Sequence, residues 1–303
     1  MTTENAGSSH FESHITIDAA GDTVINQLKQ NTALNIQTLK KAMKNGSVWL
    51  ESSHGIHRIR RAKKNVNKGD QIHLYYDEAI QNTQPEAAIL IADEGDYSIW
   101  NKPYGMYSQG TKWGDQCSIY RWAEQHLKPQ RTAFVVHRLD RAANGLIILA
   151  HSKKMAAVFS GMFKYRKIKK QYKAVIAGNI QQLTLPYTIS SDIDDKPAVT
   201  HIKEQTHNGD RNNGKTSTLT IEIETGRKHQ IRKHLAEISH PILGDRLYGK
   251  EPYHGNLQLC AYLLEFHCPL TDELKTYVLK DTVFKKPAPE NTALENMPPE
   301  NAS

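Results

Sequence analysis

The segment Val-His-Arg-Leu-Asp-Arg at 136–141 lies between two β-like runs, 132–136 and 146–150, and this arrangement constrains the fold more than any other feature of the chain. Asp140 is therefore expected on a short loop between neighbouring strands, where functional side chains are often found. Arginines flank it within the segment, and nearby positive charge favours the ionised carboxylate. An ionised Asp on such a loop is a candidate nucleophile. Taken alone, however, the segment fits an ordinary surface Asp–Arg pair better.

Further blocks of sequence surround this segment in a fixed order. They are WNKPYGM at 100–106, KKQYKAVIAG at 169–178, IEIETGRKHQIRKHL at 221–235, HPILGDRLYG at 240–249 and LQLCA at 257–261. Together with the segment at 136–141, these blocks resemble the RluA family of pseudouridine synthases, over about 89–283. The resemblance implies an enzyme that isomerises uridine in RNA to pseudouridine, a reaction that needs no redox cofactor, metal or energy source.

The resemblance implies a catalytic role for Asp140, Tyr172 and Arg232. Asp140 would supply the anion near the sugar, either by attacking the sugar or by removing a sugar proton so that the base is eliminated. Arg232 would pair with Asp140 and favour its ionised form, with a phosphate contact as the alternative. Tyr172 would stack on the uracil, and removal of the proton from carbon 5 is its alternative role.

Four further residues are expected at the substrate: Arg138, His137, Ile231 and Lys102. A uracil in a folded RNA must leave its stack before a carboxylate can reach its sugar, so base flipping is implied. Arg138 would fill the vacated space or hold the flipped nucleotide, and Ile231 would contact the base. His137 would support the loop through hydrogen bonds. Lys102 would either reach a phosphate or brace the site.

The chain has a formal net charge of +7, and its basic residues are clustered. One cluster, 29–68, contains a single acid, Glu51, and a second cluster, 164–173, contains none and is interleaved with tyrosines. A solvated charged face is the usual interpretation of one such run, but two runs beside a nucleoside site favour phosphate contacts with RNA. The predicted RNA-binding residues are Lys40, Lys41, Arg58, Arg60, Arg61, Lys169 and Lys170.

A length of 303 residues suggests two domains. Residues 15–80 resemble the small αL-motif RNA-binding domain, and a basic α/β module without RNA contacts is the alternative. Residues 87–284 mix strand-like runs with helical stretches, which is typical of an α+β fold with a mixed, largely antiparallel sheet. The resemblance identifies this part with the pseudouridine synthase fold. We expect a flexible tail at 1–14, a linker at 81–86 and a disordered tail at 285–303.

Periodicity and turn residues predict the individual elements. Helices are expected after Thr23, over 34–44 with Asn45-Gly46 as the stop, and near 119–126, 153–162 and 229–238. Strands are expected at 47–51, 71–76, 89–92, 97–100, 146–150, 172–177, 217–224 and 276–278, with a hairpin loop at 207–214.

Composition also bears on compartment and partners. The N-terminus lacks the regions of a signal peptide and no apolar run approaches a membrane span, so we expect a cytoplasmic protein. Three cysteines without a CxxC spacing fit a reducing compartment. His229, His234 and His240 lack the spacing of a helical ligand pair, and no acidic or cysteine cluster completes a set, so no metal is expected.

The expected protein is a monomer that acts on structured RNA, with ribosomal RNA favoured over transfer RNA. Two other functions stay open at this stage. The first is a non-catalytic RNA-binding or ribosome-assembly protein that retains the fold. The second is a hydrolase that liberates the base and leaves an abasic site.

Overall fold

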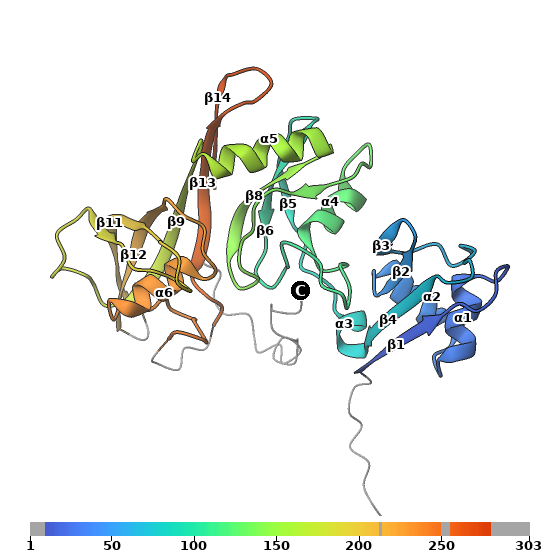
Figure 1. The fold of residues 1–303 in the computed structure, drawn as a ribbon. Helices are drawn as coiled ribbons and strands as arrows, with labels where there is room; N and C mark the ends of the chain where they lie inside the picture. The colour runs from blue at the N-terminus through green and yellow to red at the C-terminus, as the bar shows by residue number, and fades with distance from the viewer. Residues whose placement is uncertain (1–9, 212–213, 250–254, 280–303) are drawn as a thin grey trace, which may run out of the picture. The chain divides into compact units, whose positions relative to one another are not determined.

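The computed structural model describes residues 10–211, 214–249 and 255–279 (Figure 1). Contacts divide these residues into two compact units. The first contains the described residues up to 85 together with 109–122, and the second contains 86–108 and those that follow 122. The range predicted as one catalytic domain, 87–284, therefore includes a segment that packs with the first unit.

The first unit is a four-stranded antiparallel sheet in the order β1-β4-β2-β3. Its elements are β1 (His10–Thr16), α1 (Val24–Asn31), α2 (Ile36–Lys44), β2 (Val48–Ser52), β3 (Gly55–Arg58), β4 (Gln71–Asp77) and α3 (Glu78–Asn82). Leu28 of α1 and Leu39 and Met43 of α2 share one apolar core with Ile72 and Leu74 of β4. The helices and the two strands predicted in this part of the chain are confirmed.

The N-terminal strand β1 corrects the predicted tail over 10–14, and residues 1–9 of that tail lie outside the described residues. β1 pairs with β4 in antiparallel register along its whole length. Ile15 is buried, and Phe11 packs against the core on the same side of the strand. The alternation is hard to recognise in the sequence because these two apolar side chains stand among His, Glu and Ser. The tail predicted at 285–303 lies outside the described residues.

Local sequence explains where α2 begins and ends. The side-chain oxygen of Asn35 accepts a hydrogen bond from the Thr38 N–H at 2.9 Å, which caps the first turn. Asn45 ends the helix, and Gly46 follows with φ of +83°, a conformation that glycine adopts without strain. A Cβ at Gly46 would also collide with the carboxylate of Asp115. The predicted stop is confirmed.

The second unit is built on a ten-stranded mixed sheet. Its strands are β5 (Ile89–Asp93), β6 (Tyr97–Lys102), β7 (Phe134–Val135), β8 (Asn144–Ala150), β9 (Ile168–Ala177), β10 (Tyr187–Ile189), β11 (Thr200–Arg211), β12 (Gly214–Ile223), β13 (Leu259–His267) and β14 (Leu274–Val278). The path runs β10-β11-β12-β9-β13-β8-β6-β5, with β14 on β13 and β7 on β8. Among the described strand pairs, β13 and β8 run parallel and the others antiparallel. The predicted α+β fold is confirmed.

The remaining helices are α4 (Ile119–His126), α5 (Lys153–Lys164) and α6 (Gln230–Glu237), close to their predicted ranges. In Figure 1, α5 lies across the strands of the second unit. Met155 and Phe159 of α5 share an apolar core with Leu146 and Ile148 of β8 and Phe266 of β13. This core fixes β8, the strand that follows the loop bearing Asp140.

The sequence does not predict β10, β11 and β13. Thr, His, Lys, Glu and Gln side chains follow one another along β11, so no apolar alternation marks it as a strand. For the same reason the hairpin loop predicted at 207–214 is shorter in the structure. β11 continues to Arg211 and β12 starts at Gly214, and 212–213 lie outside the described residues.

Candidate active site

Asp140 lies on the loop between β7 and β8, as the sequence predicts. Hydrogen bonds hold the residues on both sides of it. The Ser108 hydroxyl donates to the Leu139 carbonyl oxygen at 2.7 Å and accepts from the Leu139 N–H at 2.9 Å. The Gly105 N–H donates to the Arg141 carbonyl oxygen at 2.9 Å. Gly105 and Ser108, in the segment between β6 and α4, therefore fix the backbone of the Asp140 loop.

Lys102 belongs to this scaffold, and its burial corrects the predicted substrate contact. The side chain is fully buried at the end of β6. Its ammonium group donates to the carbonyl oxygens of Pro103 at 3.1 Å, Met106 at 2.8 Å and Ala143 at 2.7 Å. A buried charge satisfied by three carbonyl groups braces the loop and is not available to a phosphate. Of the two roles considered for Lys102, bracing is the one that fits.

Arg232 on α6 points its Nη1 toward Asp140 Oδ2 at 3.5 Å. Its closer partner is Asp245, which accepts hydrogen bonds from Nε and Nη2 at 2.8 Å each. Burial opposes the charge on Arg232, but the bonds to Asp245 and the charge of Asp140 outweigh it, so the pKa of Arg232 is raised. The sequence places Asp245 within the 240–249 block, but nothing there reveals that it binds Arg232.

Tyr172 is buried on β9. Burial first, and the negative charge of Asp140 second, raise the pKa of the phenol well above its usual value. A phenol that keeps its proton suits stacking on a base better than proton removal, the two roles expected for Tyr172.

His137 supports the Asp140 loop, the role expected for it. Its Nε2 accepts a hydrogen bond from the Ile148 N–H at 3.0 Å, which requires an unprotonated nitrogen. Burial first, and the charge of Lys170 second, hold the pKa of His137 well below its usual value. The ring also contacts the Phe163 ring, with centroids 4.4 Å apart. The neutral His137 ring therefore joins the Asp140 loop to β8.

The remaining predicted substrate residues differ in exposure. Arg138 directly precedes Leu139 in the Asp140 loop, and it is exposed. Ile231 is buried beside Arg232 on α6. Arg138 is thus accessible to a nucleotide from solvent, and Ile231 is packed inside the second unit.

The two lysines predicted to bind RNA on β9 have different surroundings. Lys169 is exposed and pairs with Glu265 at 3.7 Å. Lys170 is half-buried, and its ammonium nitrogen lies 5.3 Å from the Phe163 ring centroid. Burial lowers the pKa of Lys170 to about 8. Because side chains alternate along a strand, Lys170 shares a face of β9 with Tyr172.

The predicted RNA-binding residues of the first unit separate into two groups. Arg58 and Arg60 are engaged inside the unit. The Arg58 Nε donates to the Gly46 carbonyl oxygen at 2.9 Å, and the Arg60 guanidinium bonds to Asp115. The Arg58 guanidinium also donates to the Thr111 carbonyl oxygen, so both arginines join the two stretches of chain in this unit and are not exposed phosphate ligands. Lys41 donates to Asn82 Oδ1 at 2.7 Å on the surface.

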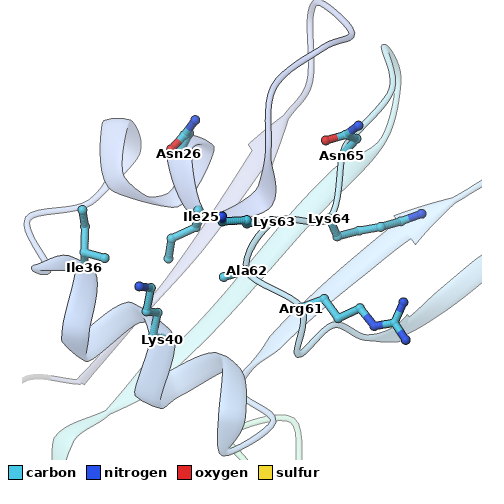
Figure 2. Close-up of a pocket in the computed structure, with 9 residues that line it drawn as sticks. All are labelled: Ile25, Asn26, Ile36, Lys40, Arg61, Ala62, Lys63, Lys64 and Asn65. Carbon is cyan, nitrogen blue, oxygen red and sulfur yellow. The ribbon is translucent and has the colours of Figure 1, made fainter.

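Lys40 and Arg61 line a pocket of about 820 Å³ between the helices and the loop at 61–65 (Figure 2). Lys63 and Lys64 add two further basic side chains. The other lining residues are Ile25, Asn26, Ile36, Ala62 and Asn65. The lining therefore combines four basic residues with three apolar ones, Ile25, Ile36 and Ala62.

Several features are not found in the part of the chain that the structure describes. No group of three or more His, Cys, Asp or Glu side chains there is placed to hold a metal ion. No helix among the described residues is long and apolar enough to cross a membrane. Cys117, Cys260 and Cys268 are free and buried.

Comparison with known proteins gives a consistent result. The family model described as RNA pseudouridylate synthase matches residues 96–237. An uncharacterized RNA pseudouridine synthase of Bacillus subtilis, YhcT, is 30% identical over 236 residues, which cover 69% of this chain and 74% of that protein. The tRNA pseudouridine synthase C of Haemophilus ducreyi is 31% identical over 217 residues, covering 61% and 87%. The ribosomal large subunit pseudouridine synthase D of the same organism is 28% identical over 228 residues, covering 68% of each.

A solved structure supports the fold. The structure of human RNA pseudouridylate synthase domain containing 1 superposes with a TM-score of 0.54 at 20% identity, covering 71% of this chain and 99% of that one. Fold and relatives together define the class, an isomerase that acts on uridine in RNA. The chain belongs to the RluA-like family of RNA pseudouridine synthases.

Proposed function

We propose that this pseudouridine synthase uses Asp140 as its catalytic anion and acts on ribosomal RNA in preference to transfer RNA. The observation that carries the first part is the placement of Asp140 3.5 Å from Arg232, on a loop held by Ser108. The similar proteins include both a tRNA enzyme and a ribosomal RNA enzyme, so their names do not choose between the two substrates.

The reaction is an isomerisation, so the protein has to supply an anion at the sugar and no cofactor. The bond from uracil N1 to the anomeric carbon breaks, the base turns, and its carbon 5 joins the same sugar carbon. The proton of carbon 5 leaves and N1 gains one, so the atoms balance without a cofactor. Asp140 either attacks the anomeric carbon or removes a sugar proton, and both routes need an ionised carboxylate that is open to the ribose.

The surrounding residues prepare the substrate. A uridine in folded RNA has to be flipped out of its stack. Arg138 fills the vacated space or holds the flipped nucleotide, and its exposure to solvent supports this role. Tyr172 stacks on the uracil, and Ile231 closes the apolar side of the site. Arg232 keeps Asp140 in place and ionised.

The first unit supplies a second contact with RNA. Lys40, Arg61, Lys63 and Lys64 line the pocket of Figure 2, where phosphate groups would displace counterions. Lys41 and the exposed Lys169 extend the basic surface of their own units. A separate basic unit suits a large structured RNA, which supports ribosomal RNA as the substrate.

The test of this function uses transcripts labelled with tritium at uracil carbon 5. Formation of pseudouridine releases tritium to water and leaves the base attached to an intact RNA chain. A hydrolase would release free uracil and leave an abasic site, and a binding protein would release nothing. Mapping pseudouridines in cellular ribosomal and transfer RNA with and without the protein then identifies the substrate, and a lost site in transfer RNA alone would contradict the proposed preference.

A further inference from the structure

Arg232 is held on three sides. Its Nε and Nη2 each donate to Asp245 at 2.8 Å, a bidentate arrangement. The Tyr248 ring centroid lies 5.1 Å from the guanidinium carbon. The third nitrogen, Nη1, faces Asp140 Oδ2 at 3.5 Å. Asp140 therefore interacts with the one nitrogen that Asp245 does not use.

Asp245 is itself fixed by the backbone. Its side chain is fully buried, and its Oδ1 accepts hydrogen bonds from the N–H groups of Leu247 at 3.0 Å and Tyr248 at 3.1 Å. Burial favours the neutral acid, but the bonds from Arg232 and these two N–H groups outweigh it, so the pKa of Asp245 is lowered. Asp245 is an ionised and rigid anchor.

The division of the Arg232 nitrogens between Asp245 and Asp140 affects the reactivity of Asp140. A guanidinium without Asp245 can turn and bind Asp140 with two nitrogens, which is the strongest form of this pair. Such a pair would draw the carboxylate away from a ribose and stabilise its negative charge, which makes it less reactive. With Asp245 present, two carboxylates share the Arg232 guanidinium. Asp140 then contacts Arg232 through Nη1, at a longer distance than Asp245 does.

We propose that Asp245 is a positioning residue for the isomerisation: it orients Arg232 so that Asp140 is held near it and stays available to the sugar. The inference rests on the proposed roles of Asp140 and Arg232. Asp245 is buried behind Arg232 and acts through it, without touching the substrate.

The first experiment compares Asp245→Asn with the wild-type full-length chain in the tritium-release assay. We expect kcat to fall on the order of 10²-fold, because a small misplacement of a reacting group has effects of this size. KM for RNA is expected to change by less than about threefold, because the binding contacts lie elsewhere. The acidic limb of the pH profile of kcat/KM is expected to move to lower pH, because the undivided charge of Arg232 favours the ionised Asp140.

The matched control is Asp194→Asn. Asp194 binds Lys233, the residue after Arg232 on the same helix, at 2.7 Å, and it is exposed. Loss of this pair is expected to leave kcat, KM and the pH profile unchanged. An Asp245→Asn protein with wild-type kcat and pH profile would overturn the proposal.

A double-mutant cycle separates positioning from general stability. If Asp245 acts through Arg232, adding Asp245→Asn to Arg232→Gln lowers kcat by less than about twofold further. The double variant leaves neither Arg232 nor Asp245 as a buried charge without its partner, and circular dichroism of the two single variants and the double variant checks that each is folded. A further loss as large as in the wild-type background would overturn the inference alone. Absence of tritium release from the wild-type chain would instead overturn the proposed function.

Discussion

The charged and titratable side chains around Asp140 are held in place by burial and by hydrogen bonds with the backbone. Lys102 is buried among three carbonyl oxygens, and Asp245 accepts from two N–H groups as well as from Arg232. His137 stays neutral because it accepts from the Ile148 N–H in a desolvated position. Of the two carboxylates that share Arg232, Asp140 is partly exposed and Asp245 is fully buried.

Lys102→Met is expected to lower the free energy of unfolding by about 2–4 kcal/mol, because three carbonyl oxygens lose their charged donor. Urea unfolding followed by circular dichroism measures the change. Lys203→Met, at an exposed position on β11, is the control and should lie within about 0.5 kcal/mol of the wild type. A loss in the Lys102 variant no larger than in this control would contradict the bracing role.

Lys170→Met is expected to stabilise the protein near neutral pH. Burial lowers the pKa of Lys170 to about 8 in the folded chain, from an ordinary value of 10.5. The folded chain releases this proton more readily than the unfolded one, so the wild type gains stability as pH rises from 8 to 10.5. The advantage of the variant is about 1–2 kcal/mol at pH 7, allowing for solvent at a half-buried amine, and shrinks over that window. An advantage that grows between pH 7 and pH 10 in urea unfolding would contradict this.

At the scale of elements, the site is assembled by segments that precede and follow the strands. The residues after β6 hold the Asp140 loop, α6 carries Arg232, and the turn at 245–249 anchors it. The chemistry is therefore carried by loops and a helix N-terminal turn, while β8 and β9 supply a rigid base.

Sequence reasoning was successful where one residue pattern determines an element. The aliphatic run of β8 and the cap and stop of α2 are of this kind. It failed for β11, whose polar side chains give no alternation, and for β1, which was not predicted as a strand. It also missed Asp245, because the partner of a buried carboxylate depends on the three-dimensional packing of α6 against the following turn.

Ser108→Ala is expected to lower kcat about tenfold, because the Leu139 N–H and carbonyl next to Asp140 lose their shared partner. KM for RNA should remain near the wild-type value. Ser118→Ala is the matched control, since its buried hydroxyl donates to the Asp115 carbonyl oxygen at 2.6 Å within the first unit. Equal effects of the two substitutions on tritium release would argue against a specific role of Ser108.

At the scale of the whole molecule, two units with different chemistry lie on one chain. The family match, 96–237, falls mainly within the second unit, and the pocket with four basic residues lies in the first. The net charge of +7 supports association with a polyanion in general terms. Affinity and catalysis are therefore expected to be separable by mutation.

Replacing Lys63 and Lys64 with Ala is expected to weaken RNA binding similarly for all sequences and to reduce the salt slope of log Kd by about 1–2. kcat at saturating RNA should be unchanged. The control replaces Lys203 and Lys275, which removes the same charge from the second unit. A salt slope equal to that of the wild type would contradict a phosphate-binding role for the pocket in Figure 2.

The most direct measurement of the central claim is tritium release by Asp140→Asn, with RNA affinity determined on the same preparation. The account predicts a loss of activity on the order of 10³-fold or more, with Kd for RNA within about threefold of the wild type, because the amide keeps the shape of the side chain and loses its charge. Asp272→Asn, on a side chain that is 97% exposed, should remain fully active. An Asp140→Asn protein that releases tritium at the wild-type rate would contradict the assignment of Asp140.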